Sequence, residues 1–369
     1  MKVAVLGAGG FVGARIMERA GLNHAWSTTP FLRSPRGLAR IGKFDVRPSF
    51  PVADGVDDLS GRLGGYKAVV NVAVGDPENI CRDVQQAYEA SMRAGAQLFI
   101  HLSSAVVFGR VTSGAIHDDS PPDTRSWMLY ARQKALAEDY LRSMMRDGNP
   151  KIVVLRPGLI WGPRSPWSIL PARQLASGVA WVGGLGIGHC NIVHVDNLVR
   201  CIETVIKCPS APGGFYNIAD PGQVTWASFY YAMAEGLGYP RERVKFTDAG
   251  YLVLTPGALL DRMKEMEGLR RLIKNVLATL SPGSKDLLKR LVPGLGKAAP
   301  QPPPPADAVI PASAPMLPRD LWVLHNTKRR LPTEKFLRDY GDPGLTSFEA
   351  GLAGTLEWLR FAGYATQGS

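Results

Sequence analysis

The sequence predicts an α/β protein in which a doubly wound parallel (Rossmann) sheet is joined to a smaller, mostly helical substrate-binding part. Short apolar runs that read as buried strands alternate along the chain with helical stretches, and this alternation is typical of parallel sheets. The first apolar run leads directly into the glycine-rich loop GAGGFVG at residues 7–13. A strand, a glycine loop and a helix in this order are typical of a dinucleotide-binding unit.

Residues 2–6 are expected to form the first buried strand, and a helix is expected to start near Phe11. Gly7 allows the tight turn, and Gly10 lets the backbone approach a pyrophosphate at the helix N-terminus. Gly13 lets the helix lie close to the strand. A glycine turn without a ligand is the alternative interpretation. The loop residues expected to contact the cofactor are Gly7, Gly10, Phe11, Val12 and Gly13.

The second strand indicates which dinucleotide is bound. A site for NAD usually has an acid at the end of this strand, on the ribose 2′-hydroxyl. Between Arg19 and Phe44 there is no Asp or Glu, and Arg33 stands where the acid would be, with Arg36 nearby. Arginine suits a 2′-phosphate, so NADP is preferred over NAD, and solvated loop charges are the alternative interpretation. Asp45 and Val46, at the expected end of the third strand, would meet the adenine.

The strands and helices expected after the second strand place the candidate catalytic residues beside the cofactor. Residues 67–74 read as a buried strand whose end (Val72, Ala73, Val74) passes behind the cofactor, and a helix is expected from about residue 79 to 94. The run QLFIHLSS is the next strand and delivers Ser103 and Ser104. A helix starting near Trp127 follows, and the run KIVVLRPGLIWGPR is a further strand and loop.

Tyr130 and Lys134 lie four residues apart, so one helix face carries both side chains. Hydride transfer at a carbinol carbon needs a partner for the hydroxyl proton. A phenol has a pKa near 10, and a nearby ammonium lowers it by favouring the phenolate. Ser104 can hydrogen-bond the substrate oxygen. The alternative interpretation of the pair alone is an ordinary solvated helix face.

In order along the chain, these motifs resemble the extended short-chain dehydrogenase/reductases, the NAD-dependent epimerase/dehydratase family. The matching segments are GAGGFVG, VVNVAV, LSSAVVFG (with Phe108 in place of a tyrosine), YARQK, LRPGLIWGPR, NIVHVDNLV, FYNIAD and TSFEAGLAGTLEWLR. The resemblance implies that Tyr130 is the general acid/base, that Lys134 holds the ribose hydroxyls and that Ser104 positions the substrate oxygen. It also implies that the backbone of Pro157, Gly158 and Leu159 meets the nicotinamide amide.

Two departures from the family pattern narrow the expected function. Dehydratases of the family carry an acidic pair where this chain has Ala105 and Val106, so 4,6-dehydration is not expected. Residues 157–160 lack the asparagine that many nucleotide-sugar enzymes use to bind phosphates. We therefore expect an NAD(P)-dependent oxidoreductase, a reductase or dehydrogenase that transfers hydride at a carbinol or carbonyl carbon of a small molecule. A sterol-like or other apolar alcohol is one candidate substrate. A nucleotide-sugar epimerase with tightly bound cofactor is the alternative, and a non-catalytic NADP-binding sensor or assembly protein is the alternative of another class.

The expected cofactor domain comprises residues 1–158 and 190–224, and the substrate-binding part comprises 159–189 and 225–369. Residues 159–188 hold Trp161, Trp167 and Trp181, and Trp127 lies just before Tyr130; aromatic walls of this kind suit a flat or apolar ligand. Packing in the core is the alternative for them. The residues expected to contact substrate are Val106, Trp127, Trp161, Arg164, Trp181 and His194.

Residues 258–297 are expected to be an insertion, followed by a proline-rich linker at 298–318. Residues 268–297 contribute +6 to the net charge of +11 and carry apolar residues at helical spacing. A lid helix with a solvated basic face is one interpretation, and contact with an anionic membrane surface is another. Contact with an acidic substrate or a partner protein is the third.

The expected compartment is the cytoplasm, with membrane association as the alternative. The start of the chain reads as a strand rather than a signal peptide, no apolar run approaches the length of a membrane span, and the four cysteines show no metal-ligand spacing. The expected partner is a small-molecule substrate, without nucleic acid or metal. A homodimer is expected by analogy with the family.

Overall fold

The computed structural model describes residues 1–23, 27–44, 48–49, 55–109, 116–146, 150–248, 251–252 and 317–366. Asp45 and Val46 lie outside these ranges, so their predicted contact with adenine is outside the described residues. The predicted insertion at 258–297 and nearly all of the linker at 298–318 also lie outside them. The predictions of a lid or membrane contact there, and of a homodimer, stay predictions.

A sheet of six parallel strands forms the centre of the molecule. Its strands are β1 (Lys2–Leu6), β2 (Ser27–Phe31), β3 (Ala68–Asn71), β4 (Leu98–Leu102), β5 (Lys151–Pro157) and β9 (Gly214–Ile218). Their order is β2-β1-β3-β4-β5-β9, and every neighbouring pair is parallel. The chain moves outward from β1 to β2 and then returns to β3 on the other side of β1. This reversal opens a crevice at the carboxyl ends of β1 and β3, where ligands bind in such sheets.

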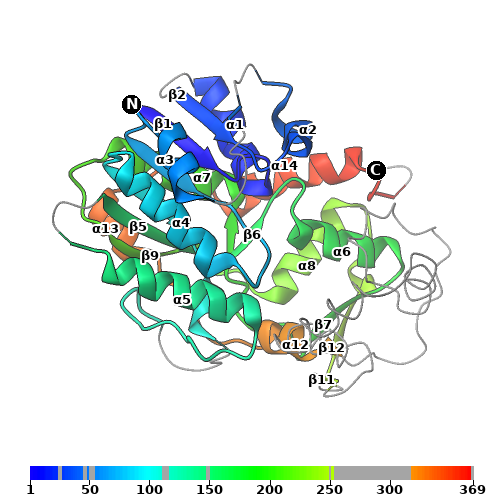
Figure 1. Ribbon diagram of the computed structural model, residues 1–369. Helices are drawn as coiled ribbons and strands as arrows, with labels where there is room; N and C mark the ends of the chain where they lie inside the picture. The colour runs from blue at the N-terminus through cyan, green and yellow to red at the C-terminus, as the bar shows by residue number, and fades with distance from the viewer. Residues whose placement is uncertain are drawn as a thin grey trace, which may run out of the picture.

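Helices cover both faces of the sheet (Figure 1). One face carries α1 (Phe11–Asn23), α7 (Val195–Lys207) and α13 (Glu334–Tyr340). The other face carries α3 (Val56–Arg62), α4 (Ile80–Arg93) and α5 (Leu129–Ser143). The predicted fold class, a doubly wound parallel sheet, is therefore confirmed.

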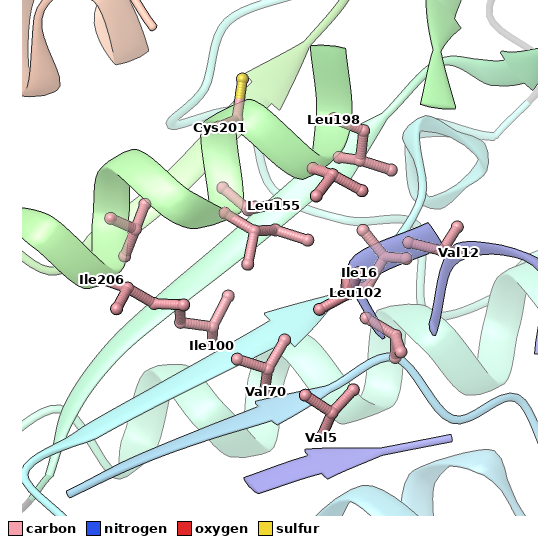
Figure 2. Close-up of a cluster of buried hydrophobic side chains, with 14 of the residues drawn as sticks. Val5, Val12, Ile16, Val70, Ile100, Leu102, Leu155, Leu198, Cys201 and Ile206 are labelled. Carbon is pink, nitrogen blue, oxygen red and sulfur yellow. The ribbon is translucent and has the colours of Figure 1, made fainter. Parts of the chain in front are cut away.

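Both faces of the sheet are buried because strand residues alternate between two apolar layers. Val3 and Val5 of β1 belong to the layer under α1 and α7, whereas Ala4 and Leu6 belong to the layer under α3 to α5. Figure 2 shows Val5 on the α7 side of the sheet, together with side chains from β3, β4 and β5. This double burial explains why the strands read as continuous apolar runs in the sequence.

A second apolar core lies beside the sheet, to the right in Figure 1. Its elements are β6 (Leu159–Trp161), α6 (Pro166–Ala176), β7 (Ala180–Gly183), β8 (Ile192–His194), α8 (Trp226–Gly236), β10 (Val244–Thr247) and α14 (Phe348–Phe361). β6 pairs with β8, and β7 pairs with β10. The predicted domain boundaries remain a prediction.

Short elements complete the described chain. They are η1 (Pro35–Gly37), α2 (Leu38–Ile41), η2 (Ala105–Phe108), η3 (Arg241–Arg243), β11 (Tyr251–Leu252), β12 (Leu317–Pro318) and α12 (Arg319–His325). No helix in the described ranges combines the length and the apolar character needed to cross a membrane.

Candidate active site

The glycine loop forms the predicted turn between β1 and α1. Gly7 has a φ of +85°, a conformation that favours glycine. A Cβ atom on Gly7 would lie 2.6 Å from the Cα atom of Ala73, in the loop after β3. A Cβ atom on Gly13 would collide with the carbonyl oxygen of Gly7. The bare backbone at the start of α1 is therefore a cradle that fits a dinucleotide pyrophosphate.

A cavity of about 1580 Å³ runs from this cradle to the first turn of α5. Its volume exceeds the roughly 300–1,000 Å³ of a site for one drug-sized ligand, so a dinucleotide and a substrate fit together. The predicted site residues that line it are Gly7, Gly10, Phe11, Val12, Arg33, Val72, Ala73, Val74, Ser103, Ser104, Val106, Tyr130, Lys134, Pro157, Gly158 and Leu159. Seven other predicted residues of the described chain are not in that lining: Gly13, Arg36, Trp127, Trp161, Arg164, Trp181 and His194.

Tyr130 and Ser104 meet on the wall of the cavity. Tyr130 lies in the first turn of α5, and Ser104 follows β4, where its Oγ accepts a hydrogen bond of 3.3 Å from the Val106 amide. Burial raises the pKa of the Tyr130 phenol above its ordinary value, and a side-chain hydrogen bond with Ser104 opposes that rise. The phenol is therefore protonated at neutral pH and can act as a proton donor.

Lys134 lies one turn further along α5, where it is buried and also lines the cavity. Its Nζ donates a hydrogen bond of 2.7 Å to the carbonyl oxygen of Leu102, the last residue of β4. Burial lowers the pKa of Lys134 to about 8, and the charge of Glu138 opposes this shift. The expected lowering of the Tyr130 pKa by Lys134 is not seen in the described structure, where burial raises this pKa and Ser104 alone opposes the rise. The ammonium of Lys134 is instead held by the carbonyl oxygen of Leu102.

A buried ion pair lies behind Lys134. Glu138, on the same face of α5, accepts hydrogen bonds of 2.6 to 3.1 Å from the Arg156 guanidinium on β5, and both side chains are 0% exposed. A third guanidinium nitrogen donates to the carbonyl oxygen of Asp118 at 2.7 Å. The Arg156 guanidinium also lies 4.8 Å from the centre of the Phe108 ring. These contacts fix the position of the α5 face that carries Tyr130 and Lys134.

The loop after β5 supplies the next part of the cavity wall. The amide of Gly158 donates to Ile218 at 3.0 Å, and the amide of Leu159 donates to the carbonyl oxygen of Asn191 at 2.7 Å. A Cβ atom on Gly158 would collide with that same oxygen. The predicted contact of this loop with nicotinamide therefore cannot use these two amides in the arrangement seen here, because both already donate to backbone carbonyls.

Trp161 and His194 are placed in the second core. Trp161 is fully buried, and its indole nitrogen donates to Asp220 Oδ2 at 2.7 Å. The His194 ring lies 5.0 Å from the Trp161 ring, and the His194 amide also donates to Asp220. The structure therefore corresponds to the core-packing interpretation of Trp161, in which the side chain supports the cavity wall from behind.

The remaining predicted contacts lie elsewhere on the molecule. Arg164 is exposed and has a φ of +69°, a left-handed conformation that is rare for arginine. Trp181 is half-buried on β7, Trp127 lies just before α5, and Arg36 is in the exposed helix η1. Burial depends on distant packing partners, which local sequence patterns do not reveal.

Sequence reasoning missed a part of the wall formed by α12 and the residues after it. The side chains there that line the cavity are Asp320, Leu321, Val323, Leu324, Thr327, Arg329 and Leu331. Asn191 holds this segment, because its Nδ2 donates to the Arg329 carbonyl at 2.8 Å and its Oδ1 accepts from the Leu331 amide at 2.9 Å. No local motif marks these residues, since the segment reaches the cavity through tertiary contacts such as those of α12 with β7 and of Asn191 with the residues after α12.

Comparison with known proteins extends the likeness from separate motifs to more than half of the chain. The model of the NAD dependent epimerase/dehydratase family matches residues 3–219. UDP-glucose 4-epimerase of Vibrio cholerae is 22% identical over 254 residues, which cover 64% of this chain and 76% of that enzyme. A 2-alkyl-3-oxoalkanoate reductase of Shewanella oneidensis is 28% identical over 257 residues, covering 60% of this chain and 62% of the reductase.

Solved structures share the fold over nearly the full length. DesIV, a dTDP-glucose 4,6-dehydratase from Streptomyces venezuelae with NAD bound, superposes with a TM-score of 0.66 at 19% identity and covers 99% of both chains. UDP-glucuronic acid 4-epimerase from Bacillus cereus has a TM-score of 0.64 at 16% identity, covering 98% of this chain and 99% of that one. At these identities the similarity shows the fold.

Proposed function

The chain belongs to the NAD-dependent epimerase/dehydratase family, and from this premise we propose that Tyr130, Ser104 and Lys134 carry out its catalysis. The observation that supports this assignment is the hydrogen-bonded pair of Tyr130 and Ser104 on a cavity that continues to the glycine cradle. When bound there, the nicotinamide supplies or accepts the hydride. The protein's own task is to manage the proton of the substrate oxygen.

In the direction of reduction, Tyr130 donates its phenolic proton to the substrate oxygen as that oxygen gains negative charge. The raised pKa of the phenol keeps this proton in place until the substrate needs it. Ser104 shares the developing charge by hydrogen bonding. Lys134 stabilises the phenolate that remains, and its ammonium keeps two donors for ribose hydroxyls, since one of its three already binds Leu102.

The cavity wall near Tyr130 supports an apolar substrate. Apolar side chains that line the same cavity as Tyr130 include Val106, Phe108, Ile116, Met128, Ile160, Trp167, Leu321, Leu324 and Leu331. The segment formed by α12 and the residues after it adds the guanidinium of Arg329 and the carboxylate of Asp320 to the lining. An oxo acid with an alkyl chain suits this combination, because the chain can lie on the apolar wall and the carboxylate can reach the arginine. The name of the Shewanella oneidensis reductase describes a compound of this kind.

Arg33, which lines the cavity after β2, supports NADP as the cofactor. Its guanidinium can bind a 2′-phosphate, for which arginine has suitable geometry. NAD remains compatible with the same cradle.

The experiment that tests the proposal uses Tyr130→Phe with NADPH and a 2-alkyl-3-oxoalkanoate, following the absorbance of the reduced nicotinamide. Loss of the proton donor should reduce turnover by about 10²- to 10⁴-fold while NADPH binding stays within about twofold. Unchanged turnover in this variant would show that Tyr130 is not the acid. If the wild type binds NADPH but turns over no substrate, the non-catalytic NADP-binding alternative is favoured.

A nucleotide-sugar epimerase is the second candidate, and the similarity to the Vibrio cholerae epimerase favours it. An epimerase would convert UDP-glucose to its 4-epimer without net oxidation of added NADPH. Incubating the wild-type protein with UDP-glucose and following the sugar by NMR separates the two candidates. Epimer formation together with no oxidation of NADPH by the oxo acid would replace the reductase proposal.

A further inference from the structure

Arg33 and Asp83 form an ion pair at the cofactor end of the cavity. Arg33 follows β2, Asp83 lies in the first turn of α4, and both residues line the cavity. The guanidinium NH2 of Arg33 lies 3.8 Å from Asp83 Oδ2. β2 and β3, which precede these residues, lie on opposite sides of β1, so the pair spans the crevice in which the dinucleotide is expected.

Gly75 provides the space for this pair. A Cβ atom on Gly75 would lie 2.5 Å from Asp83 Oδ2 and 3.1 Å from the NH2 atom of Arg33. The ion pair therefore lies directly on the loop that leaves β3, and a side chain at Gly75 would displace it. Gly75 itself lines the cavity, which places both charges beside the cofactor path.

The carboxylate of Asp83 lies close to where an NAD site usually has its acid, although the second strand itself supplies none. An NAD site usually receives its acid from the end of the second strand, and this chain has none between Arg19 and Phe44. Asp83 brings a carboxylate to the guanidinium at the end of β2, but from α4 on the other side of the crevice. The site thus holds both a cation suited to a 2′-phosphate and an acid suited to a 2′-hydroxyl.

The ion pair is easily exchanged for a ligand. The side chains of Arg33 and Asp83 are 72% and 35% exposed, and such exposed pairs contribute little to stability. A 2′-phosphate would attract Arg33 and repel Asp83, whereas a 2′-hydroxyl could donate a hydrogen bond to Asp83 and leave the pair intact.

We propose that Asp83 is a specificity-determining residue that opposes the 2′-phosphate and supports binding of NAD, so that the wild-type protein accepts both dinucleotides. This inference rests on the proposed function, since it needs a dinucleotide in the crevice. Arg33 draws the preference toward NADP, and Asp83 limits it.

The test measures dissociation constants of NADH and NADPH by fluorescence titration for the wild type, Asp83→Asn and Arg33→Ala. Asp83→Asn should tighten NADPH binding by about fivefold and leave NADH equal or weaker, because only the charge that repels phosphate is removed. Arg33→Ala should weaken NADPH by a similar factor and change NADH little. Raising the salt concentration should reduce the effect of Asp83→Asn, since the charges are exposed.

Asp57→Asn is the matched control. Asp57 is 94% exposed, pairs with Arg93 at 2.7 Å and is not in the cavity lining of the described chain, so this variant makes the same charge change outside the lining. Equal shifts of both dissociation constants in Asp83→Asn, no shift in either, or the same shift in Asp57→Asn would overturn the inference. Failure of the wild type to bind either dinucleotide would instead refute the proposed function.

Discussion

The Nζ atom of Lys134 lies 2.7 Å from the carbonyl oxygen of Leu102, so the last residue of β4 holds a buried ammonium on α5. Ser104 leaves the same strand two residues later and forms a hydrogen bond with Tyr130. The end of β4 therefore sets the positions of all three proposed catalytic side chains relative to one another. A displacement of this strand end would disturb Tyr130 and Lys134 together.

Replacing Lys134 with methionine should stabilise the protein at neutral pH. Burial lowers the pKa of Lys134 from 10.5 to about 8, so between these values the unfolded chain holds a proton that the folded chain has released. Wild-type stability consequently rises with pH through this window, and below pH 8 the folded state bears the full penalty of the buried charge. The variant should be more stable at pH 7 by up to about 3 kcal/mol, with a gap that closes toward pH 10.5.

Urea unfolding of both proteins at pH 7 and pH 10 measures this gap. Lys245→Met, at an exposed lysine on β10, is the control and should show no such pH-dependent difference. A Lys134→Met protein that is less stable than the wild type at both pH values would contradict the prediction.

Replacing Glu138 with glutamine should strongly destabilise the fold. The change leaves the fully buried guanidinium of Arg156 without its carboxylate partner, and breaking a buried pair in this way costs about 3–5 kcal/mol. Glu334→Gln is the matched control, because its ion pair with Arg330 is 3.8 Å long and exposed. Denaturant unfolding at neutral pH should separate the two variants clearly, and equal free energies of unfolding would show that the buried pair is not needed.

The glycine loop, the serine strand and the tyrosine helix could be predicted from the sequence because each is a local pattern. Strand, turn and helix signals lie within a few residues of one another, and the spacing of Tyr130 and Lys134 alone puts both on one helix face. The strand order that brings these parts together follows from general rules for parallel sheets.

The substrate wall could not be predicted in the same way. Trp161 and Trp167 both looked suited to a ligand, yet only Trp167 lines the cavity, because Phe229 and Phe348 enclose Trp161. The sequence predicted that Arg33 contacts the cofactor but did not reveal its ion pair with Asp83. The pair joins two segments that come together only in the folded sheet. Side-chain burial and long-range ion pairs depend on tertiary contacts that a single sequence does not display.

Acid should loosen the attachment of α12, which forms part of the substrate wall. His325 is fully buried, and its Nδ1 accepts a hydrogen bond of 2.9 Å from the Gly183 amide, which only the neutral ring can do. Burial lowers the pKa of His325 from 6.5 to about 4. Its contribution to stability is complete above pH 6.5 and is lost as the pH falls toward 4, by up to about 3 kcal/mol.

The comparison that isolates this effect is the wild type against His325→Asn, in which the amide oxygen can accept from Gly183 but does not titrate. Free energies of unfolding at pH 7 and pH 4.5 should show a larger loss for the wild type. An equal loss in both proteins would assign the acid sensitivity to other groups.

Two glycines on α1 should respond in opposite ways to substitution by alanine. Gly13 lies where the helix crosses the glycine loop, and an added Cβ would collide with the carbonyl oxygen of Gly7, which is rigid backbone. Gly13→Ala should therefore push α1 away from β1, weaken dinucleotide binding by tenfold or more and lower stability by about 1–3 kcal/mol. Gly21 belongs to the same helix, but an added Cβ there meets nothing within 4 Å. Gly21→Ala should leave binding unchanged and stabilise the protein by about 0.5–1 kcal/mol, because alanine has the better helix propensity.

Fluorescence titration with NADPH and thermal unfolding of both variants provide the measurements. If Gly13→Ala bound NADPH as tightly as Gly21→Ala, close approach of α1 to the loop would not be a requirement of the cofactor site.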